Sequence, residues 1–255
     1  MSISIHQFPC LDDNYGYLIH DDETGQTAAV DTPEVSAINS ALGEKGWDLN
    51  VILNTHWHPD HAGGNLALKE QWACEIIGPA GEADKIPGID RRVGDGDVVE
   101  LGGSRAQVFD TPGHTAGHII FHFADDGAAF VGDTIFALGC GRLFEGSPAQ
   151  MWNSLNKIMA LDPQTQLYCA HEYTLANAKF AISVDPENKA LQERIAHIET
   201  LRAAGTPTVP SSLADELATN PFLRARDAGL RASLDMVGAD DVDVFAQTRL
   251  RKDQF

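Results

Sequence analysis

Seven histidines and aspartates in this sequence have the side chains and the spacing needed to bind divalent metal ions. Each comes after a short apolar stretch with the pattern of a β-strand, so strand-terminal loops would carry all of them. Such loops are held rigidly by a sheet and can still be reached by small molecules. Nitrogen and carboxylate oxygen ligands suit zinc, manganese or iron. The candidate ligands are His56, His58, Asp60, His61, His114, Asp133 and His171.

The spacing of these residues favours two ions over one. His56 and His58 are two residues apart, so they project from the same side of an extended chain and can reach one ion. Asp60 and His61 follow a proline that turns the chain, so they can face a second ion. The two carboxylate oxygens of Asp133 could bridge both. Seven ligands for two ions leave positions for water and substrate, whereas structural zinc sites are usually closed, cysteine-rich sets of four.

The elements that must position these residues alternate between strand and helix up to residue 173, after which the pattern is helical. We therefore predict a mixed α/β domain over residues 1–173 and a helical domain over 174–255. His118, at the start of a predicted strand, either supports the metal ligands or has a structural role. Predicted strands cover residues 2–8, 15–20, 27–31, 51–53, 75–77, 106–109, 118–123, 128–131 and 166–170, and predicted helices cover 32–45, 63–72, 148–161, 175–184, 187–203 and 240–251.

Composition and charge limit the classes of protein to consider. With 255 residues and 43% hydrophobic side chains, the chain can bury a sizeable core. The net charge of −19 repels nucleic acid and anionic lipid, and no stretch is apolar enough to span a membrane. None of the four cysteines forms a C-x-x-C pair, which favours reduced thiols. Without a secretory signal at the N-terminus or an obvious assembly element, we expect a cytoplasmic monomer.

The segments that carry the candidate ligands resemble the motifs of the metallo-β-lactamase superfamily. Thr55 to His61 matches its T-H-x-H-x-D-H motif, and three later segments match its further motifs in order. These segments are Thr111-Pro112-Gly113-His114-Thr115, Gly132-Asp133-Thr134 and His171-Glu172-Tyr173-Thr174. The resemblance implies an αββα sandwich followed by the helical domain.

The same resemblance divides the ligands between the two ions. It implies that one ion is bound by His56, His58 and His114, and the other by Asp60, His61 and His171. Asp133 would bridge the ions, and Asp60 would also be catalytic, since it would orient the attacking hydroxide.

Further segments resemble the hydroxyacylglutathione hydrolases, or glyoxalase II enzymes, within that superfamily. Residues 136–146 are similar to the G-C-G-[KR]-x-[FY]-E-G segment of these enzymes, residues 171–174 match H-E-Y-T, and residues 249–255 resemble their R-x-x-K-D ending. One departure is Phe144, where some members carry Tyr, so a hydroxyl contact to the substrate would be absent.

A basic cluster at the C-terminus offers a way for an acidic protein to capture an anion. In the resembled family, the equivalents of Arg249 and Lys252 bind the glycine carboxylate of glutathione. The equivalents of Arg142 and Tyr173 contact the rest of the peptide. The expected partner is therefore a small glutathione thioester.

The resemblance implies a metal-dependent thioesterase with two divalent ions, zinc foremost and iron or manganese as alternatives. A hydroxide bridging the ions would attack S-(2-hydroxyacyl)glutathione, typically S-D-lactoylglutathione. The products would be D-lactate and glutathione, as in the second step of methylglyoxal detoxification. The thiolate leaving group, with a pKa of about 8.5, needs no strong general acid. Lactone or β-lactam hydrolysis and persulfide oxidation at a single iron are the alternatives on this scaffold.

Overall fold

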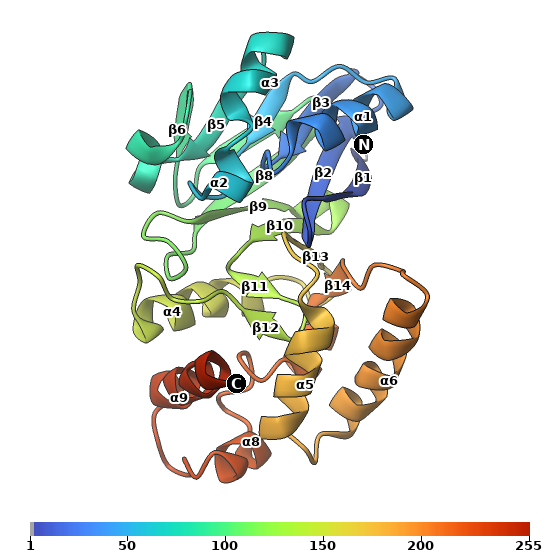
Figure 1. The fold of residues 1–255 in the computed structure, drawn as a ribbon. Coiled ribbons are helices and arrows are strands. Elements are labelled where there is room, and N and C mark those ends of the chain that lie inside the picture. The colour runs from blue at the N-terminus through green and yellow to red at the C-terminus, as the bar shows by residue number, and fades with distance from the viewer. Residues whose placement is uncertain (1–2) are drawn as a thin grey trace. The chain divides into compact units, whose positions relative to one another are not determined.

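The computed structural model describes residues 3–255, so Ser2, where we predicted the first strand to begin, lies outside the described residues. The chain forms two compact units, and Figure 1 shows the order of their elements. Unit 1 consists of Met1–Asp110 and Thr115–Gly132, and unit 2 consists of Thr111–His114 and Asp133–Phe255.

The first sheet of unit 1 has six strands in chain order. β1, β2 and β3 pair antiparallel, and β3, β4, β5 and β6 pair parallel. Parallel neighbours need crossover connections, and helical segments provide them here. The strands are β1 (Ile3–Cys10), β2 (Asn14–Asp21), β3 (Gln26–Val30), β4 (Val51–Leu53), β5 (Glu75–Pro79) and β6 (Arg91–Val93). The connecting helices are α1 (Val35–Lys45), α2 (Pro59–Ala62), α3 (Asn65–Trp72) and the 3-10 helix η1 (Ala80–Lys85).

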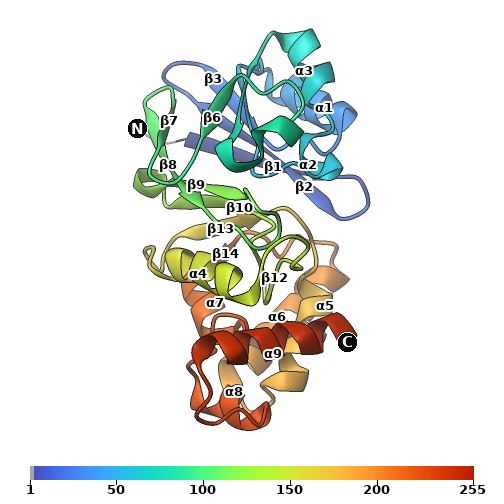
Figure 2. The same cartoon turned by 90° about the vertical axis from the view of Figure 1, so that its left-hand side faces the viewer.

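Helices α1 and α3 lie together over one face of this sheet (Figures 1 and 2). Leu42 of α1 and Leu68 of α3 are fully buried in one core cluster with Ile52 of β4 and Ile76 of β5. Each such side chain contributes about 1.5–3 kcal/mol by leaving water. The strand β4 is therefore fixed from one side by helices, and the loop that follows it starts from a rigid point.

A second, antiparallel sheet contributes four neighbouring strands to unit 1, and its apolar face packs on the first sheet. The ring of Phe130 in β10 meets that of Tyr17 in β2 edge-on, with centroids 5.6 Å apart. All five residues of β9 are buried, so its side chains are covered on both faces. These strands are β7 (Val98–Leu101), β8 (Ser104–Asp110), β9 (Ile119–Phe123) and β10 (Ala128–Gly132), with the 3-10 helix η2 (Ala124–Asp126) before β10.

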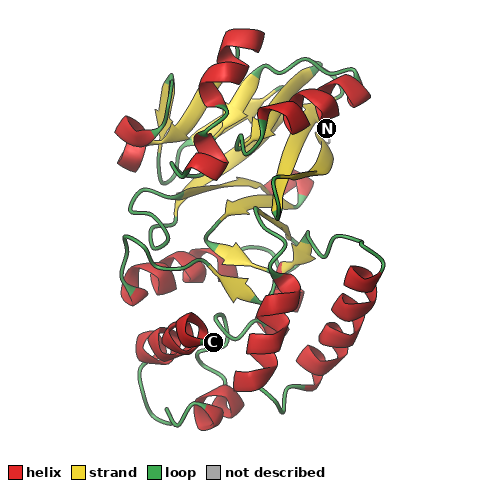
Figure 3. Cartoon of the chain, viewed as in Figure 1, coloured by secondary structure: helices red, strands yellow, loops and turns green. Residues whose placement is uncertain are grey.

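Unit 2 is mainly helical, as Figure 3 shows for the chain after β13. A capping box begins α4: Ser147 Oγ accepts the N–H of Gln150, and the side chain of Gln150 accepts the N–H of Ser147. The helices are α4 (Pro148–Met159), α5 (Thr174–Val184), α6 (Lys189–Ala203), α7 (Leu213–Thr219), α8 (Ala228–Ser233) and α9 (Asp241–Gln254). The strands pair as β11 (Ile135–Phe136) with β12 (Gly139–Cys140), and β13 (Gln166–Cys169) with β14 (Ser211–Ser212).

Every helix and strand predicted from the sequence is present among the described residues, with ends shifted by a few positions. The prediction missed α2, α7, α8 and the short strands β6, β7, β11, β12 and β14, because such short elements carry no periodic pattern. The domain boundary after residue 173 stays a prediction. Between residues 3 and 255, no helix combines the length and the apolar character that a bilayer span requires.

Asp21, at the end of β2, links two turns of unit 1 through its carboxylate. Oδ1 accepts the N–H groups of Glu23 and Thr24 at 2.9 Å, and Oδ2 accepts the N–H of Gly103 at 2.7 Å. These bonds, that of Gly103 foremost, hold the pKa of the Asp21 carboxyl below its ordinary value. The turn after β2 is thereby joined to the turn between β7 and β8.

Replacing Asp21 with Asn should lower the melting temperature at pH 7, because an amide has only one acceptor oxygen. The folded protein favours the ionised carboxylate, so its stabilising effect is complete above the unfolded pKa of about 3.9 and is lost as the pH falls further. The difference from wild type should therefore shrink below about pH 4 in thermal unfolding between pH 3 and 7. The exposed Asp48, replaced with Asn, is the control. An equal difference at both ends of the range would contradict the assignment.

Candidate metal centre

Four of the seven predicted ligands lie in unit 1, between β4 and α3. His56 is fully buried, and its Nε2 lies 3.0 Å from Nδ1 of His58, so the two rings face a common point. Next along the chain, His61 Nε2 lies 3.4 Å from Asp60 Oδ2. The segment therefore presents its donors as two adjacent pairs.

The second pair lies in a short helical turn, α2, where only a bend was predicted from the sequence. Pro59 occupies the first position of α2, where its missing N–H is not needed, and His58 precedes it as the N-cap. Asp60 and His61 then fall within the single turn of α2. Asn14 donates to Asp60 Oδ2 at 3.2 Å and holds that carboxylate from the side of β2.

Asp31, directly after β3, orients His61, a role that was not predicted from the sequence. The residue has a left-handed backbone with φ of 58° and is 6% exposed. Its Oδ2 lies 2.8 Å from His61 Nδ1, and the N–H and Oγ1 of Thr55 each donate to the carboxylate at 2.8 Å. An ionised carboxylate only accepts, so Nδ1 of His61 carries the proton and Nε2 keeps its lone pair for an ion. An acidic residue just after an apolar strand was the available signal.

His118 packs on His56, and Gly132 leaves room for that contact. The ring of His118, which precedes β9, stacks on that of His56 with centroids 4.8 Å apart. At the end of β10, Gly132 has φ of 47°, and a Cβ there would lie 2.6 Å from Thr55 Oγ1 and 2.7 Å from His118 Nε2. Only glycine fits this close approach.

The other three predicted ligands lie in unit 2 around one carboxylate. Asp133 is 6% exposed, and its two oxygens face different histidines. Oδ2 lies 3.3 Å from His114 Nε2, and Oδ1 lies 3.5 Å from His171 Nε2. His114 Nδ1 donates to the carbonyl of Arg142 at 2.9 Å, which leaves its Nε2 available for an ion.

The chemistry of both groups fits divalent metal ions. In unit 1, donor atoms of Asp31, His56 and His61 lie within 4.8 Å of one another, and because Asp31 binds Nδ1 of His61, the Nε2 of that ring is left for coordination. In unit 2 a carboxylate with one oxygen toward each of two histidines has the form of a bridging ligand. The donors are nitrogen and oxygen throughout, which suits zinc, iron or manganese.

The predicted substrate residues also lie in unit 2, and Arg249 is the most deeply buried of them at 6% exposure. Its Nη1 donates to the carbonyl of Cys140 at 3.0 Å, and its Nη2 to Asp253 Oδ1 at 2.8 Å. Arg142, whose side chain is exposed, reaches the same Asp253 oxygen at 3.7 Å. The carboxylate of Asp253 thus lies close to both guanidinium groups.

Lys252 lines a cavity of about 400 Å³ together with Lys179 of α5 and Arg202 of α6. Its Nζ lies over the rings of Phe180 and Phe255, at 5.2 and 5.5 Å from the centroids. Burial, and then the nearby Arg249, lower the pKa of Lys252. The ammonium group of Lys252 has lost part of its hydration and lies near a second cation. An anion bound beside it would therefore be attracted to both charges.

Two aromatic residues pack on the predicted ligands of unit 2. Tyr173 stacks on His171 with centroids 4.7 Å apart and an angle of 3° between the rings. Phe144 is 60% exposed, and its ring meets that of His114 edge-on at 5.3 Å.

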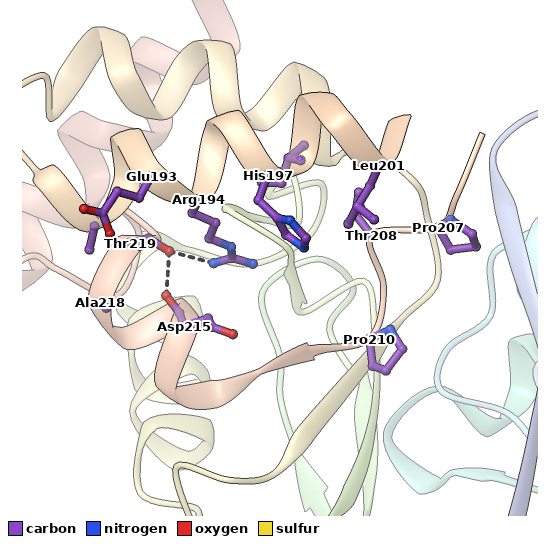
Figure 4. Close-up of a pocket in the computed structure, with 12 residues that line it drawn as sticks. Glu193, Arg194, His197, Leu201, Pro207, Thr208, Pro210, Asp215, Ala218 and Thr219 are labelled. Carbon is purple, nitrogen blue, oxygen red and sulfur yellow. Dashed lines mark hydrogen bonds between the residues drawn. The ribbon is translucent and has the colours of Figure 1, made fainter. Parts of the chain in front are cut away.

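A second cavity of unit 2, of about 440 Å³, lies beside α6 and α7 (Figure 4). Arg194 extends across it and donates to Thr219 Oγ1 at 2.6 Å, as the dashed line in Figure 4 shows. Arg194 also pairs with the fully buried Glu216. None of the predicted ligands or substrate residues lines this cavity.

Comparison with known proteins identifies the family. Residues 22–171 match the metallo-beta-lactamase superfamily, and residues 172–255 match the hydroxyacylglutathione hydrolase C-terminus. A hydroxyacylglutathione hydrolase of Hyphomonas neptunium is 58% identical over 99% of this chain and 98% of its own. One of Chelativorans sp. is 56% identical over the full length of both chains.

Solved structures agree on the fold. The crystal structure of ETHE1 from Myxococcus xanthus has a TM-score of 0.67 and 23% identity, covering 98% of each chain. The BLEG-1 B3 metallo-beta-lactamase has a TM-score of 0.64 and 19% identity, covering 86% of this chain and 99% of its own. The predicted metallo-β-lactamase-like α/β fold with a helical C-terminal region is confirmed.

Replacing Asp31 with Asn should weaken metal binding, because an amide NH2 would face His61 Nδ1 and favour the tautomer that protonates Nε2. Asn tolerates the left-handed backbone, so the fold should be kept. Changing such an orienting partner typically costs about tenfold to a hundredfold in affinity. Zinc competition against a chromophoric chelator measures this, with Asp48→Asn as the control. Unchanged zinc affinity would show that Asp31 does not select the tautomer.

Proposed function

Because the chain belongs to the hydroxyacylglutathione hydrolases, we propose that it hydrolyses the thioester of S-(2-hydroxyacyl)glutathione, with S-D-lactoylglutathione as its main substrate. The observation that carries the proposal is the full-length similarity to hydroxyacylglutathione hydrolases, at 58% identity. The products are D-lactate and glutathione, which places the reaction as the second step of methylglyoxal detoxification.

We propose that the seven predicted ligands together bind two divalent ions, with zinc foremost and iron or manganese as alternatives. Four of these residues lie close together in pairs within unit 1, and His114 and His171 lie on either side of Asp133 within unit 2. Bound divalent ions supply an activated water at neutral pH and polarise a carbonyl oxygen. The protein's own part is to fix the ligand tautomers and to place the substrate.

The side chains near the ligands have separate tasks in this proposal. Asp60, held by Asn14 at 3.2 Å, orients the attacking water by accepting its hydrogen bond. Lys252 binds the glycine carboxylate of glutathione, and Arg249 holds the strand end at Cys140 in place as well as facing the ligand. Arg142 and Tyr173 contact the peptide. The leaving thiolate is stable enough at neutral pH to depart without a protein acid.

The activities left open by the sequence are less well supported. Lactone and β-lactam hydrolysis or persulfide oxidation would share the scaffold, yet they give no reason for a C-terminal segment that matches hydroxyacylglutathione hydrolases over residues 172–255. The expectations of a monomer, of a cytoplasmic location and of no nucleic-acid or membrane partner stay predictions.

Removing the metal should abolish thiol release from S-D-lactoylglutathione, and adding zinc, iron or manganese should restore it. The active protein should contain two ions per chain, measured by elemental analysis on the same sample as the turnover assay. Thioester hydrolysis that persists in protein without detectable metal would refute the proposal, as would full activity on a lactone with none on the thioester.

Replacing Lys252 with Ala should raise KM about tenfold and leave kcat within a few-fold, because the ammonium binds a part of the substrate remote from the thioester. Lys189→Ala is the matched control, since this lysine lies on α6, away from the cavity that Lys252 lines. Steady-state kinetics with S-D-lactoylglutathione measures both constants. A KM equal to that of wild type would remove Lys252 from the binding site.

A further inference from the structure

Glu82 of η1 is a buried carboxylate that joins two backbone segments of unit 1. The residue is only 5% exposed. Its Oε1 accepts the N–H of Trp57 at 2.9 Å, and its Oε2 accepts the N–H of Gly117 at 2.8 Å. Hydrogen bonds to an ionised acceptor are stronger than those between neutral groups. Trp57 stands between His56 and His58, so the carboxylate is bonded to the middle of the H-x-H segment.

The second segment that Glu82 holds contacts His56 as well. Gly117 precedes His118, whose ring stacks on that of His56 at an interplanar angle of 26°. The two backbones approach so closely that a Cβ on Gly117 would lie 2.7 Å from the carbonyl carbon of Gly81. Only glycine therefore fits where the segment before His118 packs on η1.

The orientation of the peptide between His56 and Trp57 decides where both histidine rings point. Rotating that peptide would move the two histidines that flank it, whose Nε2 and Nδ1 atoms now lie 3.0 Å apart. The hydrogen bond from the N–H of Trp57 to Glu82 opposes this rotation. Lys85, also on η1, lies with its Nζ 4.7 Å from the centroid of the Trp57 ring and restrains the side chain of the same residue.

We propose that Glu82 is a positioning residue that holds the H-x-H segment in its metal-binding form, an inference that rests on the proposed metal site. Glu82 contacts neither substrate nor ion in this role. Its carboxylate accepts one N–H from the H-x-H segment and one from the segment that carries His118. The backbone beside His56 and the ring that stacks on His56 are therefore both held by one carboxylate. Its loss lowers metal affinity because the histidines must then be ordered by the ion itself.

Replacing Glu82 with Gln tests the role with little change in size. The amide has one carbonyl oxygen, so it can accept only one of the two N–H groups and turns its own NH2 toward the other. We expect zinc to bind at least tenfold more weakly, measured by chelator competition without substrate, and kcat at saturating zinc to stay within about threefold. Glu82→Asp, which keeps both acceptor oxygens on a shorter side chain, should recover part of the affinity. Glu75→Gln, at an exposed glutamate of β5, should match wild type.

The outcomes separate this inference from the proposed function. Wild-type protein that binds no metal would overturn both. Wild-type protein that binds two ions, with equal zinc affinity in Glu82→Gln, would overturn only the role of Glu82. A purely structural role would lower the melting temperature equally with and without zinc, whereas a positioning role makes the loss larger with zinc present. An equal loss therefore also counts against the proposal.

Discussion

The arrangement of the proposed metal ligands in unit 1 depends on two buried carboxylates and the hydrogen bonds that they accept. Asp31 and Glu82 are 6% and 5% exposed, and a buried carboxylate needs hydrogen-bond donors from the protein in place of water. The donors come largely from the ligand segment itself: the N–H and hydroxyl of Thr55, the Nδ1 of His61 and the N–H of Trp57. The same hydrogen bonds therefore satisfy the two acids and fix the segment that carries the proposed metal ligands.

The charge of the whole chain and the local cations near Lys252 act on an anionic ligand over different distances. The chain carries a net charge of −19, which on its own would repel a glutathione thioester. At physiological ionic strength, exposed charges beyond about 8 Å are largely screened, whereas a cation about 4 Å from a ligand anion contributes about 4 kcal/mol in a protein-like dielectric. The local cation therefore outweighs the distant acids. Asp253 pairs with Arg249 and lies near Arg142, so it offsets part of the charge of these two residues. The N–H donors of Lys252 stay available for a ligand.

Sequence patterns predicted the parts of the structure whose causes are local. The strand β4 and the polar segment after it could be predicted because an apolar run of three residues gives way abruptly to histidines and an aspartate, and α1 ends at Gly46 in the left-handed conformation that glycine favours. The orienting role of Asp31 could not be predicted, since it depends on a contact with a residue 30 positions away. Glu82 acts across 25 and 35 positions. Helices such as α7 depend on tertiary packing, which leaves no periodic trace in seven residues.

All four cysteines are buried, and this lowers the reactivity of their thiols. Desolvation raises the pKa of Cys10 and Cys169 to about 12 and that of Cys140 to about 11. For Cys140 the effect prevails even though a guanidinium nitrogen of Arg249 lies 3.8 Å from the sulfur. Disulfide exchange requires a thiolate, and at neutral pH these groups hold almost none. Three of the four thiols are therefore poor partners for disulfide exchange, including exchange with oxidised forms of the glutathione that the proposed reaction releases.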